Sequence, residues 1–99
     1  NDGEQRRDFT YVGDVVNANI LAATHPEDLK GESFNIGNGD NYSVNELADM
    51  FGGEKAEGEK VLEPFQTLAD NSKAKNILNW NPTGDLPTWI EKYKKDLGI

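Results

Sequence analysis

The chain has 99 residues and a mass of 11.0 kDa, enough for one small domain or for a piece of a larger one. With 28% charged and 35% hydrophobic residues, no apolar run near the ~18 residues of a membrane-spanning helix and no secretory signal, it is expected to be soluble and cytoplasmic, without a membrane partner. The net charge of -8 argues against nucleic acid as a partner, because such binding rests on neutralising phosphates with basic side chains.

The first quarter of the chain predicts a turn, a strand and a helix. Asn1-Asp2-Gly3 is typical of a turn between two strands, and β-forming residues predict a strand over 7–12. No strand precedes the turn and the first residue is not Met, so we expect that the chain was trimmed and that a strand has been cut away. Asp14 is the expected N-cap of a helix that runs to about Ala23 and is ended by His25-Pro26.

The middle of the chain predicts a second strand and a second helix. Phe34 and Ile36 alternate with polar residues over 33–36, which indicates a short strand. The glycine-rich stretch 37–41 then forms a turn. Ser43 and Glu46 have the spacing of a capping box, so a helix is expected to begin there and to end at Gly52-Gly53.

The last part predicts a weak strand followed by two helices. Residues 54–60 are polar and predict a loop, and 61–65 predict a short strand interrupted by Pro64. Asp70 and Asp85 are the expected N-caps of the third and fourth helices. Short strands that alternate with helices indicate the α/β class with some α+β character, in a single unit.

Several motifs that would carry chemistry are incomplete. Gly37-Asn38-Gly39 follows a predicted strand, but the G-x-G-x-x-G spacing fails at Tyr42, so this loop is interpreted as a structural turn rather than a nucleotide site. Tyr11, Tyr42 and Tyr93 lack a lysine four positions later, which excludes the Tyr-x-x-x-Lys pair of short-chain dehydrogenases. We therefore expect no catalytic and no cofactor-binding residue in this chain.

Metal sites and other catalytic groups are not indicated either. The sequence has no cysteine and one histidine, which excludes thiolate ligands and paired imidazoles. His25 is interpreted as a solvated residue at a helix end, and the carboxylates fall mainly at caps and in loops. Trp80 and Trp89 are expected to anchor the core.

Arg6 and Arg7 are the two arginines of the chain and stand next to each other. On a strand they point to opposite faces, so one of them at most faces a given pocket. Arg7 would share its face with Phe9 and Tyr11, where its guanidinium could hold a phosphate through charge-assisted bonds. A surface ion pair of Arg7 with Glu4 or Asp8 is an equally good interpretation of the sequence.

Three stretches together resemble the C-terminal part of extended short-chain dehydrogenases/reductases. They are 2–23, with its R-D-F-x-Y-V segment, 31–50, and 67–82, which contains S-K-A-K and L-x-W-x-P, followed by the D-L-P-T-W-I helix. The resemblance covers nearly the whole chain in family order. It identifies the chain with the NAD-dependent nucleotide-sugar epimerases and dehydratases, and most closely with enzymes of the UDP-glucose 4-epimerase type.

The resemblance implies a site for a nucleotide-diphosphate sugar. Arg7 corresponds to the family arginine that contacts this ligand, while Lys60 and Glu63 occupy the arginine and acid positions of an R-x-G-[DE] segment. Phe65 stands where many members carry another arginine, and Gly13 stands where they carry the first Asp of Y-V-D-D-V. Lys60 lacks the bidentate fork of an arginine, so the second half of the implied clamp is altered.

The family's cofactor loop and Tyr-x-x-x-Lys pair lie upstream of the matched stretches. The resemblance therefore implies that residues 1–99 form one C-terminal substrate-binding domain fragment, inactive alone, while NAD belongs to an N-terminal Rossmann domain that is absent here. Exposed apolar surface is expected where that domain docks, or where the chain self-associates. Two alternatives stay open: a free-standing, non-enzymatic module that binds a nucleotide-sugar or a protein, and one half of a split enzyme.

Overall fold

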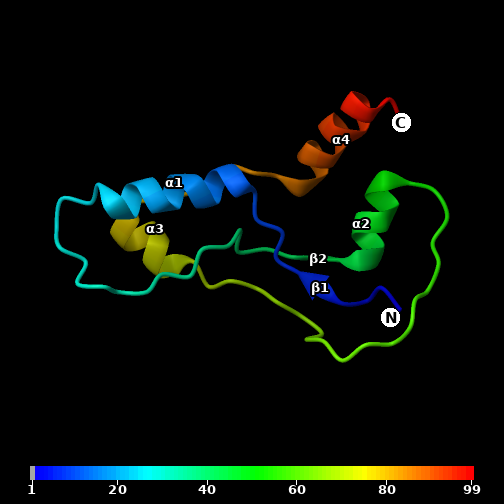
Figure 1. Ribbon diagram of the computed structural model, residues 1–99, viewed down its shortest axis with the longest axis horizontal. Coiled ribbons are helices and arrows are strands. Elements are labelled where there is room, and N and C mark those ends of the chain that lie inside the picture. Colours follow the sequence, from blue (N-terminus) through cyan, green and yellow to red (C-terminus); the bar gives the residue numbers. More distant parts are fainter. Residues whose placement is uncertain (1) are drawn as a thin grey trace.

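The computed structural model describes residues 2–99, so the Asn1 part of the predicted N-terminal turn lies outside the described residues. Four helices and two very short strands follow one another along this part of the chain (Figure 1). This content confirms the predicted α/β class. The elements are β1 (Arg6–Arg7), α1 (Val12–Ala23), β2 (Tyr42–Ser43), α2 (Val44–Phe51), α3 (Ser72–Leu78) and α4 (Leu86–Leu97).

The molecule is elongated and thin, with extents of 51 × 34 × 16 Å. α1 and α3 lie against each other at one end, α2 and α4 lie near each other at the opposite end, and the strands lie between the two pairs (Figure 1). The radius of gyration is 16.4 Å, whereas a compact domain of this length has about 13 Å. Within residues 2–99, no helix has the length and apolar character needed to cross a bilayer.

β1 lies between β2 and the extended segment 65–67. It pairs antiparallel with β2, in the register Arg6 to Ser43 and Arg7 to Tyr42. On its other edge, Arg6 N donates to the Phe65 carbonyl at 2.8 Å and Thr67 N donates to the Arg6 carbonyl at 3.0 Å. The short strand therefore connects segments that lie far apart in the sequence.

None of the three predicted strands is found as predicted: one is shorter, and the other two segments are not strands. The strand expected over 7–12 ends at Arg7, because the chain already enters α1 at Val12. Residues 33–36 are extended, and Phe34 and Ile36 pack on the core, but no strand of the described chain lies beside them. Residues 61–65 are exposed and contain Pro64, and the pairing forms just beyond them, as an isolated bridge from Arg6 to Gln66.

The main core lies between α1, α3 and the segment that follows α3. Ala74 and Trp80 are fully buried, and Ala18 and Leu78 are 4% exposed. The indole Nε1 of Trp80 donates a hydrogen bond of 2.8 Å to the Asp14 carbonyl, so its one polar atom is satisfied inside the core. This confirms Trp80 as a core anchor. Five partly buried residues surround the cluster: Leu21, Ala22, Leu29, Phe34 and Ile36.

Trp89 does not anchor the core as predicted. Its side chain is 45% exposed and stacks on the Tyr93 ring, with 4.9 Å between ring centroids. Tyr93 in turn meets Phe51 of α2 edge to face. Ile90, which is 1% exposed, is the residue by which α4 is buried, because this helix has one neighbouring helix rather than a surrounding core.

Two of the four predicted N-caps are confirmed. Ser43 and Glu46 form the capping box, with Glu46 N donating to Ser43 Oγ at 3.0 Å, and Thr88 N donates to Asp85 Oδ2 at 3.2 Å. The prediction for Asp70 is wrong by one residue, because Asn71 occupies the N-cap position of α3.

Asp14 is not an N-cap but a buried residue in the first turn of α1. The helix begins earlier than predicted, with Tyr11 at the N-cap position, and this turns the Asp14 carboxylate toward the loop before α4. Asp14 is 4% exposed and accepts bonds from Thr83 N at 3.0 Å, Thr83 Oγ1 at 2.8 Å and Gly84 N at 2.8 Å. α1 is thereby fixed to the connection between α3 and α4.

His25 is half-buried rather than a purely solvated helix end. Its Nε2 lies 3.1 Å from the Ile77 carbonyl of α3, and its Nδ1 lies 3.2 Å from Glu27 N. The ring thus joins the end of α1 to the end of α3. Both ring nitrogens are occupied by backbone groups, which leaves no geometry for a general base.

The pKa of Asp14 determines an expected pH dependence of stability. Burial alone would raise this pKa, but the hydrogen bonds from Thr83 and Gly84 outweigh it and hold the pKa below the usual 3.8. The folded state therefore gains stability from ionised Asp14 above pH 3.8, and loses this gain as the pH falls through the lower folded value.

Replacing Asp14 by Asn removes the charge and turns an amide NH₂ toward backbone donors. We expect the free energy of unfolding at neutral pH to fall by about 1.5–3 kcal/mol, the range for hydrogen bonds to charged groups. Urea unfolding followed by tryptophan fluorescence should show this difference shrinking toward about pH 2. Asp28→Asn, at an exposed loop position, is the matched control. A difference that is constant over the whole pH range would contradict this assignment.

Candidate functional site

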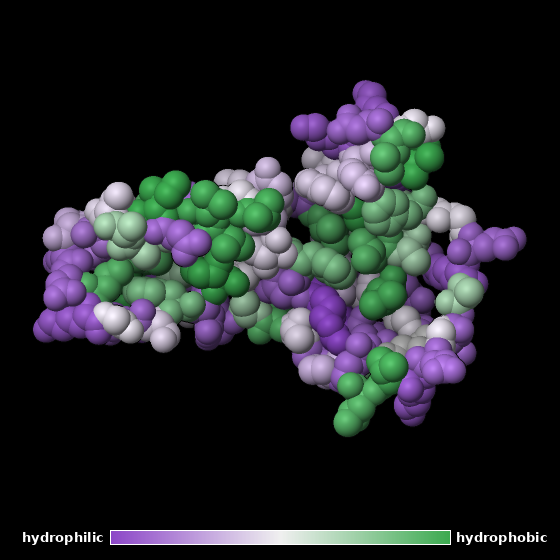
Figure 2. Space-filling model, in the orientation of Figure 1, coloured by the Kyte–Doolittle hydropathy of each residue, from purple (hydrophilic) through white to green (hydrophobic). Residues whose placement is uncertain are grey.

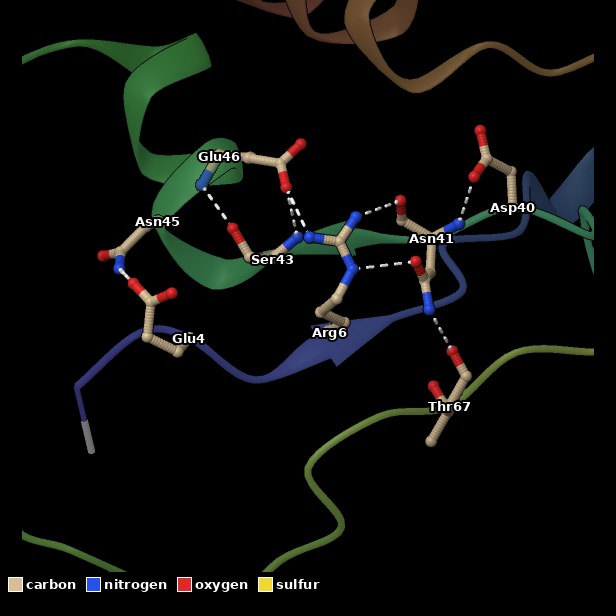
Figure 3. A network of polar contacts seen from close by, with 8 residues as sticks. All are labelled: Glu4, Arg6, Asp40, Asn41, Ser43, Asn45, Glu46 and Thr67. Carbon is tan, nitrogen blue, oxygen red and sulfur yellow. Dashed lines mark hydrogen bonds and ion pairs between the residues drawn. The ribbon is translucent and has the colours of Figure 1, made fainter.

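Arg6 is the centre of a polar network that joins β1 to β2 and α2 (Figure 3). Its Nη1 donates to Glu46 Oε1 at 2.7 Å, while Nε and Nη2 donate to the side-chain and backbone oxygens of Asn41 at 2.9 and 3.0 Å. Asn41 is buried and donates from Nδ2 to the Thr67 carbonyl at 3.0 Å. All three nitrogens of the Arg6 guanidinium are thus engaged within the protein.

Glu46 links this network to the capping box of α2. The hydrogen bond from Arg6, supported by the donor at Ser43 N, lowers the pKa of Glu46 below its usual value. Glu46 therefore stays ionised and paired at neutral pH. Arg6 is accordingly a structural residue, and of the two arginines Arg7 is the one for which anion binding stays a prediction.

Arg7 is oriented toward the segment before the bridge to β1. Its Nη1 donates to the Arg6 carbonyl at 2.7 Å and to the Phe65 carbonyl at 3.4 Å. Its Nη2 lies 3.6 Å from Glu63 Oε2, which is an ion pair without a close hydrogen bond. The Arg7 side chain is 26% exposed, so part of it faces solvent.

The aromatic surroundings predicted for Arg7 are not found. Phe9 and Tyr11 instead line a pocket of about 250 Å³ together with Leu86 and Trp89 at the start of α4, and Arg7 is not among its lining residues. The prediction assumed that the strand alternation continues past Arg7, whereas β1 ends there.

The structure brings two of the three sequence-predicted site residues together. Arg7 and Glu63 form the ion pair, whereas Lys60 is exposed on the preceding loop and does not join them. The neighbouring Phe65 is 62% exposed. The arrangement therefore offers one arginine, one carboxylate and an uncovered aromatic ring at the edge of β1.

Asp8 is the site-forming residue that the sequence interpretation missed. Its Oδ1 accepts from Asn38 N at 2.9 Å and from Thr10 Oγ1 at 3.2 Å, and its Oδ2 accepts from Gly39 N at 3.0 Å and from Ala69 N at 3.1 Å. With four donors satisfied, Asp8 is not the ion-pair partner of Arg7. The only hint in the sequence is its position beside Arg7, which suggested a salt bridge instead.

The glycine turn at 37–39 fits the structural interpretation. The N–H groups of Asn38 and Gly39, which would point at a phosphate in a nucleotide loop, donate to the Asp8 carboxylate. The Gly37 carbonyl accepts from Asn71 Nδ2 at 2.9 Å. An anionic side chain from the protein itself thus occupies these donors, so the loop does not fit the pyrophosphate of a dinucleotide.

The surroundings of Tyr42 do not favour acid–base chemistry at this side chain. Burial first, and then the nearby carboxylates of Asp85, Asp40 and Glu46, raise the pKa of Tyr42 above 10.0. A phenol that acts as a general base needs the opposite shift. Among residues 2–99, no group of three or more His, Asp or Glu side chains is placed to hold a metal ion.

Comparisons with known proteins agree with the resemblance in the sequence. The NAD dependent epimerase/dehydratase family matches residues 1–37. UDP-glucose 4-epimerase of Corynebacterium glutamicum is 34% identical over 98 residues, which cover 91% of this chain and 30% of that protein.

Solved structures show the same relation in three dimensions. UDP-glucuronic acid 4-epimerase from Bacillus cereus, in complex with UDP-glucuronic acid and NAD, superposes with a TM-score of 0.79 at 34% identity, over 97% of this chain and 34% of that one. UDP-glucose 4-epimerase from Thermotoga maritima, with UDP-glucose, gives a TM-score of 0.69 at 35% identity, over 98% of this chain and 34% of that one. The chain therefore belongs to the NAD-dependent epimerase/dehydratase family, and it spans about a third of the length of these UDP-sugar epimerases.

Proposed function

We propose that the chain is the UDP-sugar-binding, C-terminal portion of an NAD-dependent epimerase of the UDP-glucose 4-epimerase type, and that it is not catalytic alone. Arg7 binds the diphosphate with Glu63 beside it, and Lys60, which lies outside this pair, adds a positive charge from the preceding loop. The observation that carries this proposal is the partly exposed Arg7 side chain, whose guanidinium is held by two backbone carbonyls and lies 3.6 Å from one carboxylate. Such a cation can bind a phosphate by donating charge-assisted hydrogen bonds to its oxygens.

In this proposal the cofactor is bound outside the chain. When bound, NAD supplies the hydride acceptor and donor of the reaction. The glycine turn at 37–39 supports this, since two of its N–H groups donate to Asp8 rather than facing a phosphate. The contribution of this chain is to bind and orient the nucleotide-sugar. A cytoplasmic location is part of the proposal.

Exposed apolar surface supports a partner for this chain. The molecule exposes 7100 Å², roughly a quarter more than the about 5,600 Å² of a compact monomer of this mass. Val12, Val16 and Ile20 lie one helical turn apart along α1 and are 69%, 52% and 54% exposed. The apolar colour over α1 is visible in Figure 2. We propose that this face docks against a Rossmann domain, or against a second copy when that domain is absent.

The alternative functions predict different binding behaviour. A free-standing module is favoured by the exposed position of Lys60, outside the Arg7–Glu63 pair. Calorimetry with UDP-glucose separates the two interpretations. Micromolar binding by the chain alone indicates a module. Binding only by a chimera, in which the chain replaces the matching third of the Bacillus cereus enzyme, indicates a portion of an epimerase. Restored activity after mixing with a separate Rossmann half would indicate a split enzyme.

Replacing Arg7 tests the site in whichever form binds UDP-glucose. Arg7→Ala removes at least one charge-assisted bond of about 1.5–3 kcal/mol, so calorimetry should show an affinity loss of roughly tenfold or more. Arg7→Lys keeps the charge but lacks the paired N–H donors of the guanidinium, so its affinity for UDP-glucose should lie between those of the wild type and Arg7→Ala. Lys92→Ala, at an exposed position of α4, is the control for the loss of one positive charge. Unchanged affinity in Arg7→Ala would remove Arg7 from the site.

The exposed face of α1 predicts self-association of the isolated chain. Replacing Val16 and Ile20 by Glu places charges on this face, and sedimentation velocity should show a shift from dimers or larger species to monomers. The matched control is Asn19→Glu, which adds a charge at an exposed polar position of the same helix. A wild-type chain that is monomeric at high concentration would contradict the proposed docking face.

A further inference from the structure

We propose that Asp8 is the positioning residue for Arg7, and that it sets the place of the guanidinium by connecting β1 to the two segments around the site. This inference rests on the proposed function, because it concerns the same anion-binding group. Asp8 itself does not contact the ligand in this arrangement. It acts through the backbone.

Three of the four bonds that the Asp8 carboxylate accepts come from two segments that are distant in the sequence. Asn38 and Gly39 donate from the glycine turn that precedes β2, while Ala69 donates from the chain that continues beyond 65–67. The backbone N–H of Asp8 is also engaged, since it donates to Thr67 Oγ1 at 3.2 Å. The end of β1 is therefore fixed on both sides directly after Arg7.

The segment that Asp8 fixes is also the one that Arg7 contacts. Arg7 reaches the Phe65 carbonyl and the Glu63 carboxylate, and these residues lead directly into the stretch held at Thr67 and Ala69. A shift of this stretch relative to β1 would change the distance between the guanidinium and Glu63. In this proposal Asp8 thus determines how strongly Glu63 neutralises the charge of Arg7, and therefore how strongly Arg7 can still attract an anion.

The packing at Asp8 leaves little freedom for another position. A Cβ atom at Gly37 would overlap the Ala69 side chain and would lie 3.0 Å from Asp8 Oδ2. Glycine is therefore required where the turn approaches the carboxylate. This close approach lets three backbone N–H groups reach one side chain.

Asp8→Asn provides the test, because the effect of the lost charge and the effect of the lost hydrogen bond on anion binding have opposite signs. Loss of one negative charge near the site would by itself strengthen anion binding. An amide in place of the carboxylate, however, turns its NH₂ toward a backbone donor and releases the turn or Ala69. We expect about a tenfold weaker association with UDP, the factor that corresponds to roughly one lost hydrogen bond. Uridine, which has no phosphate, should bind as it does to the wild type.

The measurement is an NMR titration of the chain with UDP and with uridine to millimolar concentration, with the Arg7 Nε–H signal recorded throughout. Asp28→Asn is the control of equal charge, with an exposed carboxylate that accepts from one backbone N–H. In the Arg7→Ala background, Asp8→Asn should cause no further loss of UDP affinity, because the two residues act as one unit. Where Asp8→Asn does not fold, Asp8→Glu is measured instead, since it keeps the charge but displaces the strand end.

Two results would overturn the inference while leaving Arg7 in the site. In the first, the Asp8→Asn variant binds UDP as tightly as the wild type. In the second, Asp8→Asn lowers UDP affinity by the same factor in the Arg7→Ala background as in the wild type. Silence of the wild-type chain toward UDP agrees with the proposed function, in which binding needs the rest of the enzyme, and leaves the role of Asp8 to a second readout. The Arg7 Nε–H signal of the free chain then decides. A signal displaced by Asp8→Asn and not by Asp28→Asn supports positioning, and an unchanged signal overturns it.

Discussion

Backbone N–H groups that donate to two aspartates, Asp8 and Asp14, hold this chain together. Each carboxylate binds segments from distant parts of the sequence: the turn at 37–39 and Ala69 in one case, and the loop at 83–84 in the other. Hydrogen bonds to an ionised acceptor are stronger than neutral ones, and the chain has few fully buried apolar residues to take their place. The polar connections therefore define the relative positions of the elements.

This arrangement also explains why adjacent arginines have different roles. Arg6 points to the side of β1 where Asn41 and the capping box of α2 supply acceptors for every nitrogen of its guanidinium. Arg7 points to the other edge, where two carbonyls hold it and the nearest carboxylate is 3.6 Å away. Because Asp8 is saturated by other donors, it does not neutralise Arg7. The anion-binding role proposed for Arg7 thus depends on how the surrounding acceptors are distributed.

Local signals in the sequence predicted the helices well and the strands poorly. The capping box at Ser43 and the cap at Asp85 depend on neighbouring residues, and the structure confirms both. The strands at 33–36 and 61–65 failed because a strand needs a partner, which periodicity does not reveal. Asp14 and Asp8 were misinterpreted for a similar reason: their backbone N–H donors lie 30 or more positions away along the chain. The site residues Arg7, Lys60 and Glu63 came from the family resemblance, and the pairing of Arg7 with Glu63 is visible only in the fold.

The two kinds of interaction also separate the proposed binding site from the proposed docking face. Arg7 and its supports are held by hydrogen bonds among β1, the 37–39 turn and 63–69, all within the chain. Val12, Val16 and Ile20 on α1, by contrast, are exposed and lie outside that network. Covering α1 would add burial without rearranging the groups around Arg7, because Asp8 and β1 fix them independently. When a partner docks on α1, the groups of the proposed anion site would therefore already be in place. Ligand binding would then require less ordering of side chains and backbone.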